Sequence, residues 1–194
     1  MRCVPAFALS ALLTGGTLAA DPPEPTAKTK QIVGGEKVVA LIRAIESVEA
    51  FRVGSVEDYK KGETAEPDKA VAGRTITGKP VAMPKAFASK LADTLLYEGT
   101  YFKGDSKGTG MNTGVAFRGK TKDGGVVEVS FCVSKGNVFI RVLDPTGKLI
   151  KYGDCRGFRD DKLAPLRALA AEAFPDETEI QKYKPKPPVD PKAP

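Results

Sequence analysis

The chain contains no histidine and only three cysteines. Without histidine there is no Ser-His-Asp triad, no Cys-His dyad and no imidazole ligand for a metal ion. Cys132 and Cys155, the two cysteines beyond the N-terminal segment, do not have the C-x-x-C spacing of thiol–disulfide catalysts. Two cysteines without histidine also make a poor zinc site. We therefore expect no metal and no cofactor.

Clusters of basic and aromatic residues are missing as well. The formal net charge is +6 over 194 residues, and lysine and arginine are interleaved with acidic residues along most of the chain. A nucleic-acid surface needs clustered Arg and Lys with aromatic residues between them for stacking. The Gly-rich stretch 103–110 lacks the Gly-Lys-Ser/Thr ending of a phosphate-binding loop. We predict no nucleic-acid binding and interpret 103–110 as a loop.

The first twenty residues have the layout of a secretory signal peptide. Arg2 precedes an apolar run from Val4 to Leu13, and small residues end at Ala19-Ala20. The apolar run is too short to cross a bilayer. We predict that residues 1–20 are removed, that no membrane span remains, and that the rest of the chain is secreted or periplasmic.

The remaining chain is predicted to have one domain between two unstructured ends. Residues 21–33 begin with Pro- and Lys-rich sequence and favour a flexible linker. Residues 181–194 alternate Lys and Pro, which is typical of a disordered tail with polyproline character. Residues 34–180 are long enough for a single domain with its own core.

Apolar periodicity predicts an α+β fold. Apolar residues recur at three- and four-residue spacing in 35–47, 84–96 and 160–174, which predicts helices. Period-two runs predict antiparallel strands, and they are 49–55, 114–120, 126–134, 137–143 and 148–152. We therefore predict a meander sheet of about four or five strands with two or three packed helices.

The central hairpin tests this architecture. If Lys135-Gly136 is a two-residue turn, Val133, Phe131 and Val129 lie opposite Val138, Ile140 and Val142, and all six share one buried face. Leu149 then meets Val142 after a turn at 144–147.

The opposite face of this predicted sheet carries too many apolar residues to lie in water. A helix or a partner should cover it. Phe139, Leu143, Ile150 and Tyr152 are therefore our candidate interaction face, for a protein or an envelope component.

Cys132 and Cys155 are candidates for a disulfide. An even number of cysteines in an exported chain favours a bond, which would stabilise the fold by roughly 3 kcal/mol. The alternative is two separate thiols.

Short motifs resemble a group of uncharacterised exported bacterial proteins of the planctomycete type. They are Gly114-Val115-Ala116-Phe117-Arg118 with Val129-Ser130-Phe131-Cys132, extended by 48–53 and 173–181. Members often carry C-x-x-C at the end of the central strand, whereas Cys132-Val133-Ser134-Lys135 lacks the second cysteine. The resemblance implies an exported domain and carries over no site residue.

Three functions follow from these observations. The main prediction is a non-catalytic binding or interaction domain. One alternative is a carboxylate-dependent hydrolase or carbohydrate-active enzyme, which needs two carboxyls across a cleft, from Glu128, Asp144, Asp154 and Asp160. Glu128 near Arg141 is also interpreted as a surface salt bridge worth roughly 0–1 kcal/mol. The third is an inhibitor of a periplasmic enzyme that presents the loop 103–113.

Overall fold

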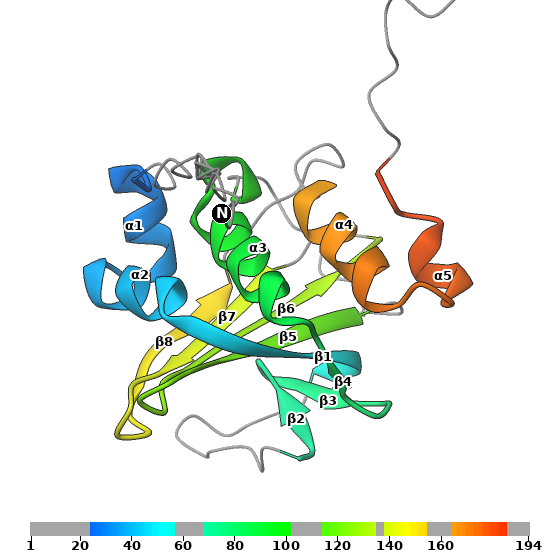
Figure 1. Ribbon diagram of the computed structural model, residues 1–194, viewed down its shortest axis with the longest axis horizontal. Helices are drawn as coiled ribbons and strands as arrows, with labels where there is room; N and C mark the ends of the chain where they lie inside the picture. The colour runs from blue at the N-terminus through cyan, green and yellow to red at the C-terminus, as the bar shows by residue number, and fades with distance from the viewer. Residues whose placement is uncertain (1–23, 57–67, 102–113, 135–137, 155–163, 186–194) are drawn as a thin grey trace, which may run out of the picture.

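The protein has helices on one face of a curved antiparallel sheet (Figure 1). The computed structural model describes residues 24–56, 68–101, 114–134, 138–154 and 164–185. Its helices are α1 (Ala27–Val33), α2 (Glu36–Arg43), α3 (Lys85–Leu96), α4 (Ala164–Ala173) and α5 (Thr178–Gln181), with a 3₁₀ turn, η1 (Glu98–Thr100). None of the helices within these ranges combines the length and apolar character needed to cross a membrane.

The sheet has eight strands in the order β2-β3-β1-β5-β6-β7-β8, with β4 paired to β1. They are β1 (Ile45–Val56), β2 (Ala70–Val71), β3 (Arg74–Ile76), β4 (Val81–Ala82), β5 (Gly114–Thr121), β6 (Val126–Cys132), β7 (Val138–Leu143) and β8 (Leu149–Asp154). The predicted α+β class is confirmed, and the predicted number of four or five strands is wrong. The additional strands β2, β3 and β4 have two or three residues each, too few for an alternating pattern to be recognised.

Three of the helices correspond to predicted ones, with shifted boundaries. Helix α2 ends at Arg43, and the chain enters β1 at Ile45, where the sequence predicts helix up to residue 47. Ile45 fits the apolar spacing of the helix and is also buried as a strand residue, so periodicity alone does not separate the two. Helix α3 begins after Pro84 as expected, and α4 covers 164–173 of the predicted 160–174. Residues 160–163 lie outside the described part of the chain.

The main core lies between the helices and the sheet. Phe117 of β5 is fully buried at its centre, with its ring 5.3 Å from Phe87 of α3 and 6.0 Å from Phe131 of β6. All six residues that the hairpin analysis assigned to one face are fully buried in this core: Val129, Phe131, Val133, Val138, Ile140 and Val142. Their common burial confirms the predicted face.

The pairing of β6 with β7 differs from the predicted register by two residues. Phe131 lies opposite Val138, and Val129 lies opposite Ile140. A shift of two residues leaves every side chain on its predicted face, because side chains alternate with a period of two. The predicted turn at Lys135-Gly136 lies outside the described residues.

Strand β8 differs from the prediction at its first two residues, Leu149 and Ile150, which exchange faces, whereas Tyr152 keeps its predicted face. The β7–β8 register shifts between Val142 and Leu143, so Leu149 pairs with Leu143 and is 49% exposed, while Ile150 packs against the helix-side core. A bulge inserts one residue into a strand and therefore reverses which side chains face inward. Placing Ile150 in the interaction face was wrong for this reason.

Helix α1 occupies part of the predicted linker 21–33. The Thr26 hydroxyl accepts a hydrogen bond from the Thr29 backbone N–H (3.2 Å), and Gly34, with φ 117°, ends the helix in a left-handed conformation. Val33 is fully buried against the core. The linker prediction is therefore wrong for this segment, because a single buried valine and two caps produce no apolar period.

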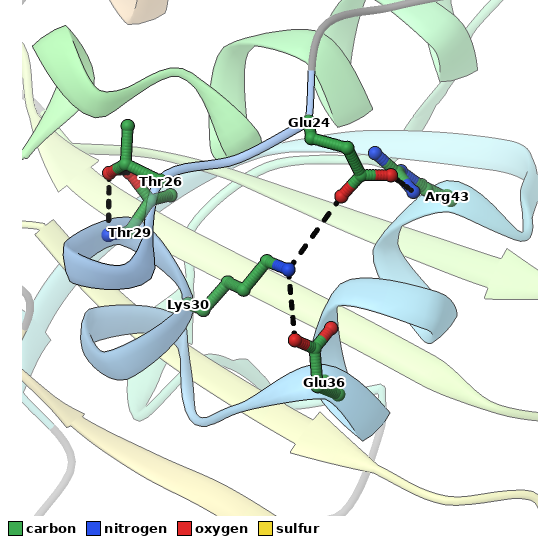
Figure 2. A network of polar contacts seen from close by, with 6 residues as sticks. All are labelled: Glu24, Thr26, Thr29, Lys30, Glu36 and Arg43. Carbon is green, nitrogen blue, oxygen red and sulfur yellow. Dashed lines mark hydrogen bonds and ion pairs between the residues drawn. The ribbon is translucent and has the colours of Figure 1, made fainter.

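A network of charged side chains holds this N-terminal segment to α2 (Figure 2). Glu24 accepts from Arg43 of α2 at 2.9 Å, and Lys30 of α1 lies 3.7 Å from Glu24 and 2.9 Å from Glu36. The two carboxylates, Glu24 and Glu36, are largely exposed, so solvent screens these pairs and each contributes little to stability. Together they fix the direction in which the chain enters α1.

The start of the predicted tail also packs on the domain. The Gln181 side-chain amide donates to the backbone oxygens of Ala171 and Phe174, both at 2.9 Å. The Arg167 guanidinium lies 5.5 Å from the centre of the Tyr183 ring. The predicted boundary at residue 181 is therefore too early by a few residues, and 186–194 lie outside the described residues.

Candidate functional site

The β2–β3 hairpin lies on the sheet face opposite the helices, here called the back face (Figure 1). The Ala70 oxygen accepts from Arg118 Nη2 at 2.8 Å. The Ala72 backbone N–H donates to Glu128 Oε2 at 2.9 Å, and the Ser130 hydroxyl donates to the Ala72 oxygen at 3.3 Å. The chain therefore covers part of this apolar face with its own hairpin, where the sequence predicted a helix or a partner.

The turn of this hairpin holds an alanine in a strained conformation. Ala72 has φ 46° and Gly73 has φ 73°, while Val71 pairs with Arg74 across the two-residue turn. Positive φ at both central residues matches the twist of a tight hairpin but is unfavourable for alanine. Two hydrogen bonds hold this conformation in place, one from the Ala72 N–H to Glu128 and one from the Ser130 hydroxyl to the Ala72 oxygen.

The four residues of the predicted interaction face have different surroundings. Phe139 is partly buried, with the Arg74 guanidinium 4.9 Å from the centre of its ring. Leu143 lines the groove described below, and Tyr152 on the edge strand β8 is 52% exposed. Ile150 lies on the helix side. The back face thus retains Leu143 and Tyr152 as residues that the hairpin leaves accessible.

One cross-strand row of the back face is charged. Glu49, Arg118, Glu128, Arg141 and Tyr152 lie opposite one another on β1, β5, β6, β7 and β8. Directly opposed residues share a face of the sheet, so their side chains are neighbours. The first four, which we call the charged row, alternate in sign.

Glu128 is the centre of the charged row. Its side chain is 2% exposed, Oε1 accepts from Arg118 Nε at 2.7 Å, and Oε2 accepts from Arg141 Nη1 at 2.9 Å. The interpretation of Glu128 and Arg141 as a surface salt bridge is therefore wrong, because Glu128 is buried beneath the hairpin and Arg141 is partly buried. Two guanidiniums share this one carboxylate, and Glu49, the other carboxylate of the charged row, pairs with Lys120, so the cations at the sheet surface outnumber the carboxylates by one.

The two arginines of the charged row differ in how many partners their guanidinium groups have. Arg118, 9% exposed, also donates to the Ala70 oxygen and lies 5.0 Å from the centre of the Phe51 ring. Arg141 is 15% exposed, and within the described structure its guanidinium has one partner, Glu128. A guanidinium has five N–H donors, so Arg141 retains donors that no described residue uses.

A groove of about 1090 Å³ opens beside the hairpin, over the charged row. Its apolar lining consists of Phe51, Ile76, Pro80, Val126 and Leu143. Its charged lining consists of Arg118, Glu128 and Arg141 at the sheet and of Glu49, Asp68, Lys79 and Lys120. Four cations thus meet three carboxylates, in a concave site that also offers apolar contact.

The carboxylates suggested for hydrolysis are engaged elsewhere. Both oxygens of Glu128 accept from cations or a backbone N–H. Hydrogen bonds from the Thr146 hydroxyl (2.6 Å) and the Lys37 ammonium (3.1 Å) hold the pKa of Asp144 well below its usual range, opposite to what a general acid needs. Asp154 ends strand β8, while Asp160 and the whole loop 103–113 lie outside the described residues.

The predicted disulfide is not formed in the part of the chain that the structure describes. Cys132 is a free, buried cysteine with its sulfur 3.2 Å from the Ser134 hydroxyl, and Cys155 lies outside the described residues. Within the same ranges, no three Cys, Asp or Glu side chains gather as metal ligands would.

Sequence reasoning identified Glu128 and Arg141 but missed Arg118 and the hairpin. A signal for Arg118 was present, because it occupies the same face of β5 that Glu128 occupies on β6. Two opposite charges on facing strands predict a pair, and the resulting pair is buried only because β2–β3 covers it. No comparable signal in the sequence predicts that cover.

No family model, curated protein or solved structure matches the chain. The resemblance to exported planctomycete-type proteins stays a prediction, and the site is interpreted from its own geometry.

Proposed function

We propose that this chain is an exported, non-catalytic binding protein and that the groove beside the β2–β3 hairpin is its binding surface. The groove carries the proposal. Its volume of about 1090 Å³ and its mixture of apolar and charged lining match the features of ligand sites, which are concave, largely apolar and provided with a few polar groups. Export is supported by the signal-like N-terminal sequence.

The contacts of the acidic residues support a binding role over the hydrolytic alternative. Acid–base hydrolysis of a glycoside needs one carboxyl that holds a proton and a second that acts as base or nucleophile. Glu128 is instead fixed between two guanidiniums, and Asp144 accepts three hydrogen bonds in a turn. These contacts occupy the carboxylate oxygens that acid–base chemistry would use.

Mapping of bound fragments by NMR tests the proposal. The full chain, labelled with ¹⁵N and ¹³C-methyl groups, is titrated with a panel of small aliphatic and aromatic fragments. We expect saturable shifts that cluster on Ile76, Val126 and Leu143. Val126→Trp fills the groove and should abolish them, whereas Lys90→Trp on the exposed surface of α3 should not. Fragments that shift other surfaces equally, or that bind the Val126→Trp variant unchanged, would contradict the proposal.

A further inference from the structure

We infer that the groove binds an amphipathic organic anion, and that Arg141 is the direct ligand of its acid group. This inference rests on the proposed function and specifies the chemistry of the ligand. It starts from the charged row, where Glu128 neutralises only one of the two guanidiniums that contact it. A site with a surplus guanidinium attracts an anion that supplies the missing charge.

Arg141 is the arginine that a ligand can reach. Arg118 is closed off by Glu128, the Ala70 oxygen and the Phe51 ring. Arg141 lines the groove, and among the described residues it contacts Glu128 through Nη1 alone. The bond to Glu128 holds the guanidinium in a fixed orientation, so its unused N–H donors are preorganised for a carboxylate, sulfate or phosphate oxygen.

The rim adds a second cation. Lys79 lies in the chain between β3 and β4, is exposed, and has no ion-pair partner within the described ranges. Lys120 is less available, because its ammonium lies 3.0 Å from Glu49. Asp68 at the rim partly offsets Lys79. The balance favours a ligand with one acid group over a polyanion.

The apolar lining of the groove favours a ligand that also has an apolar part. Val126 and Leu143 are opposite each other on β6 and β7, in the row next to Glu128 and Arg141. Ile76 and Pro80 face the same groove from the hairpin side. An inorganic anion would leave most of about 1090 Å³ unfilled, whereas an alkyl chain attached to the acid group would bury these side chains.

Titration with octanoate and octanol separates the acid group from the chain. We expect octanoate to shift the Arg141 Nε–Hε resonance and the methyl groups of Val126 and Leu143 saturably. Octanol should shift the methyl groups alone and bind about tenfold more weakly, because it lacks the charge-assisted contact. Sulfate without an alkyl chain should bind more weakly than octanoate.

Arg141→Met is the decisive variant. It leaves Glu128 paired with Arg118 and the Ala72 N–H, so no buried carboxylate is orphaned. Octanoate affinity should fall about tenfold in this variant and octanol affinity should stay within about twofold. Lys90→Met, which removes a cation paired with Glu172 on the opposite layer, should change neither.

Three results would overturn the inference. They are equal affinities for octanoate and octanol, unchanged octanoate binding in Arg141→Met, and no saturable binding of octanoate. If octanol binds the groove as well as octanoate does, the groove remains a binding site and only the anionic ligand is wrong. The fragment panel therefore tests the proposed function independently of this experiment.

Discussion

Replacing Glu128 by alanine removes the carboxylate that bridges the buried Arg118 and the partly buried Arg141. Its side chain is 2% exposed, and those of Arg118 and Arg141 are 9% and 15% exposed. Breaking a buried ion pair by removing one partner costs about 3–5 kcal/mol, because the charge left behind remains buried. The Ala72 N–H also loses its acceptor. We expect Glu128→Ala to lower the free energy of unfolding by about 3–5 kcal/mol.

Urea denaturation followed by circular dichroism measures this loss. The matched control is Glu172→Ala, which breaks the exposed pair with Lys90, whose side chains are 42% and 53% exposed. That change should cost at most about 1 kcal/mol and less in high salt, whereas the cost of Glu128→Ala should depend little on salt. A loss below about 1 kcal/mol for Glu128→Ala would refute the reasoning that the row is buried.

A triple variant separates pairing from polarity at the same position. Combining Arg118→Met, Glu128→Leu and Arg141→Met replaces the charges by apolar side chains of similar length. Such replacements of buried ion networks are often neutral or stabilising by about 1–4 kcal/mol. We expect the triple variant to be more stable than Glu128→Ala, because no buried charge is left unpaired, although the Ala70 oxygen and the Ala72 N–H still lose their partners. A triple variant less stable than Glu128→Ala would show that the row is needed for folding.

Three further predictions follow from other parts of the molecule. Because the pKa of folded Asp144 lies below the usual 3.8, its contribution to stability is present above about pH 4 and is lost as the pH falls further. Asp144→Asn should therefore lose less stability than the natural chain between about pH 5 and pH 3 in urea titrations. Phe117→Ala should cost about 3–5 kcal/mol in the same assay, against less than about 0.5 kcal/mol for the exposed Val81→Ala. The buried thiol of Cys132 should react with iodoacetamide only after unfolding, and mass spectrometry showing a native bond to Cys155 would contradict the free thiol.

The buried face of the central hairpin was predictable because several strand registers place the same side chains on that face. Valine, isoleucine and phenylalanine alternate on both β6 and β7, so a slip of two residues exchanges partners without exchanging faces. The sequence pattern therefore identifies which side chains form the core and does not identify which residue each one opposes. Pairing depends on where β6 ends, and Val133 is buried although it lies beyond Cys132, the last residue of that strand.

Strand β8 shows the limit of the same reasoning. A bulge changes the register by one residue, and that change does reverse the faces. Leu149 and Ile150 are similar in size and hydrophobicity, so the sequence is compatible with either residue facing the core. The bulge lies next to the turn at 144–147, where Asp144 accepts from the Thr146 and Lys148 N–H groups. Composition does not encode that geometry.

The candidate site was the least predictable part, because it depends on contacts between distant segments. The groove requires the hairpin at 70–76 to lie over β5 and β6, more than forty residues further along the chain. Each strand of the hairpin has too few residues for its alternating pattern to be recognised in the sequence. The turn also has Ala72 at a position of positive φ, where a sequence-based prediction would expect glycine or asparagine. The strained alanine is tolerated because Glu128 and Ser130 bind its backbone.

Placing the charged row under the hairpin costs free energy, because its charges lose their hydration. Apolar side chains would satisfy the same position with no desolvation of charge, and the neighbouring rows already consist largely of them. The hairpin covers Arg118 and Glu128 closely but leaves Arg141 at its margin, where the groove begins. Burying this network is costly, and it ends in a guanidinium with unused donors. Its role is therefore better explained by ligand binding at Arg141 than by a contribution to the stability of the fold. Its removal in the triple variant should accordingly spare the fold and abolish the preference for octanoate over octanol.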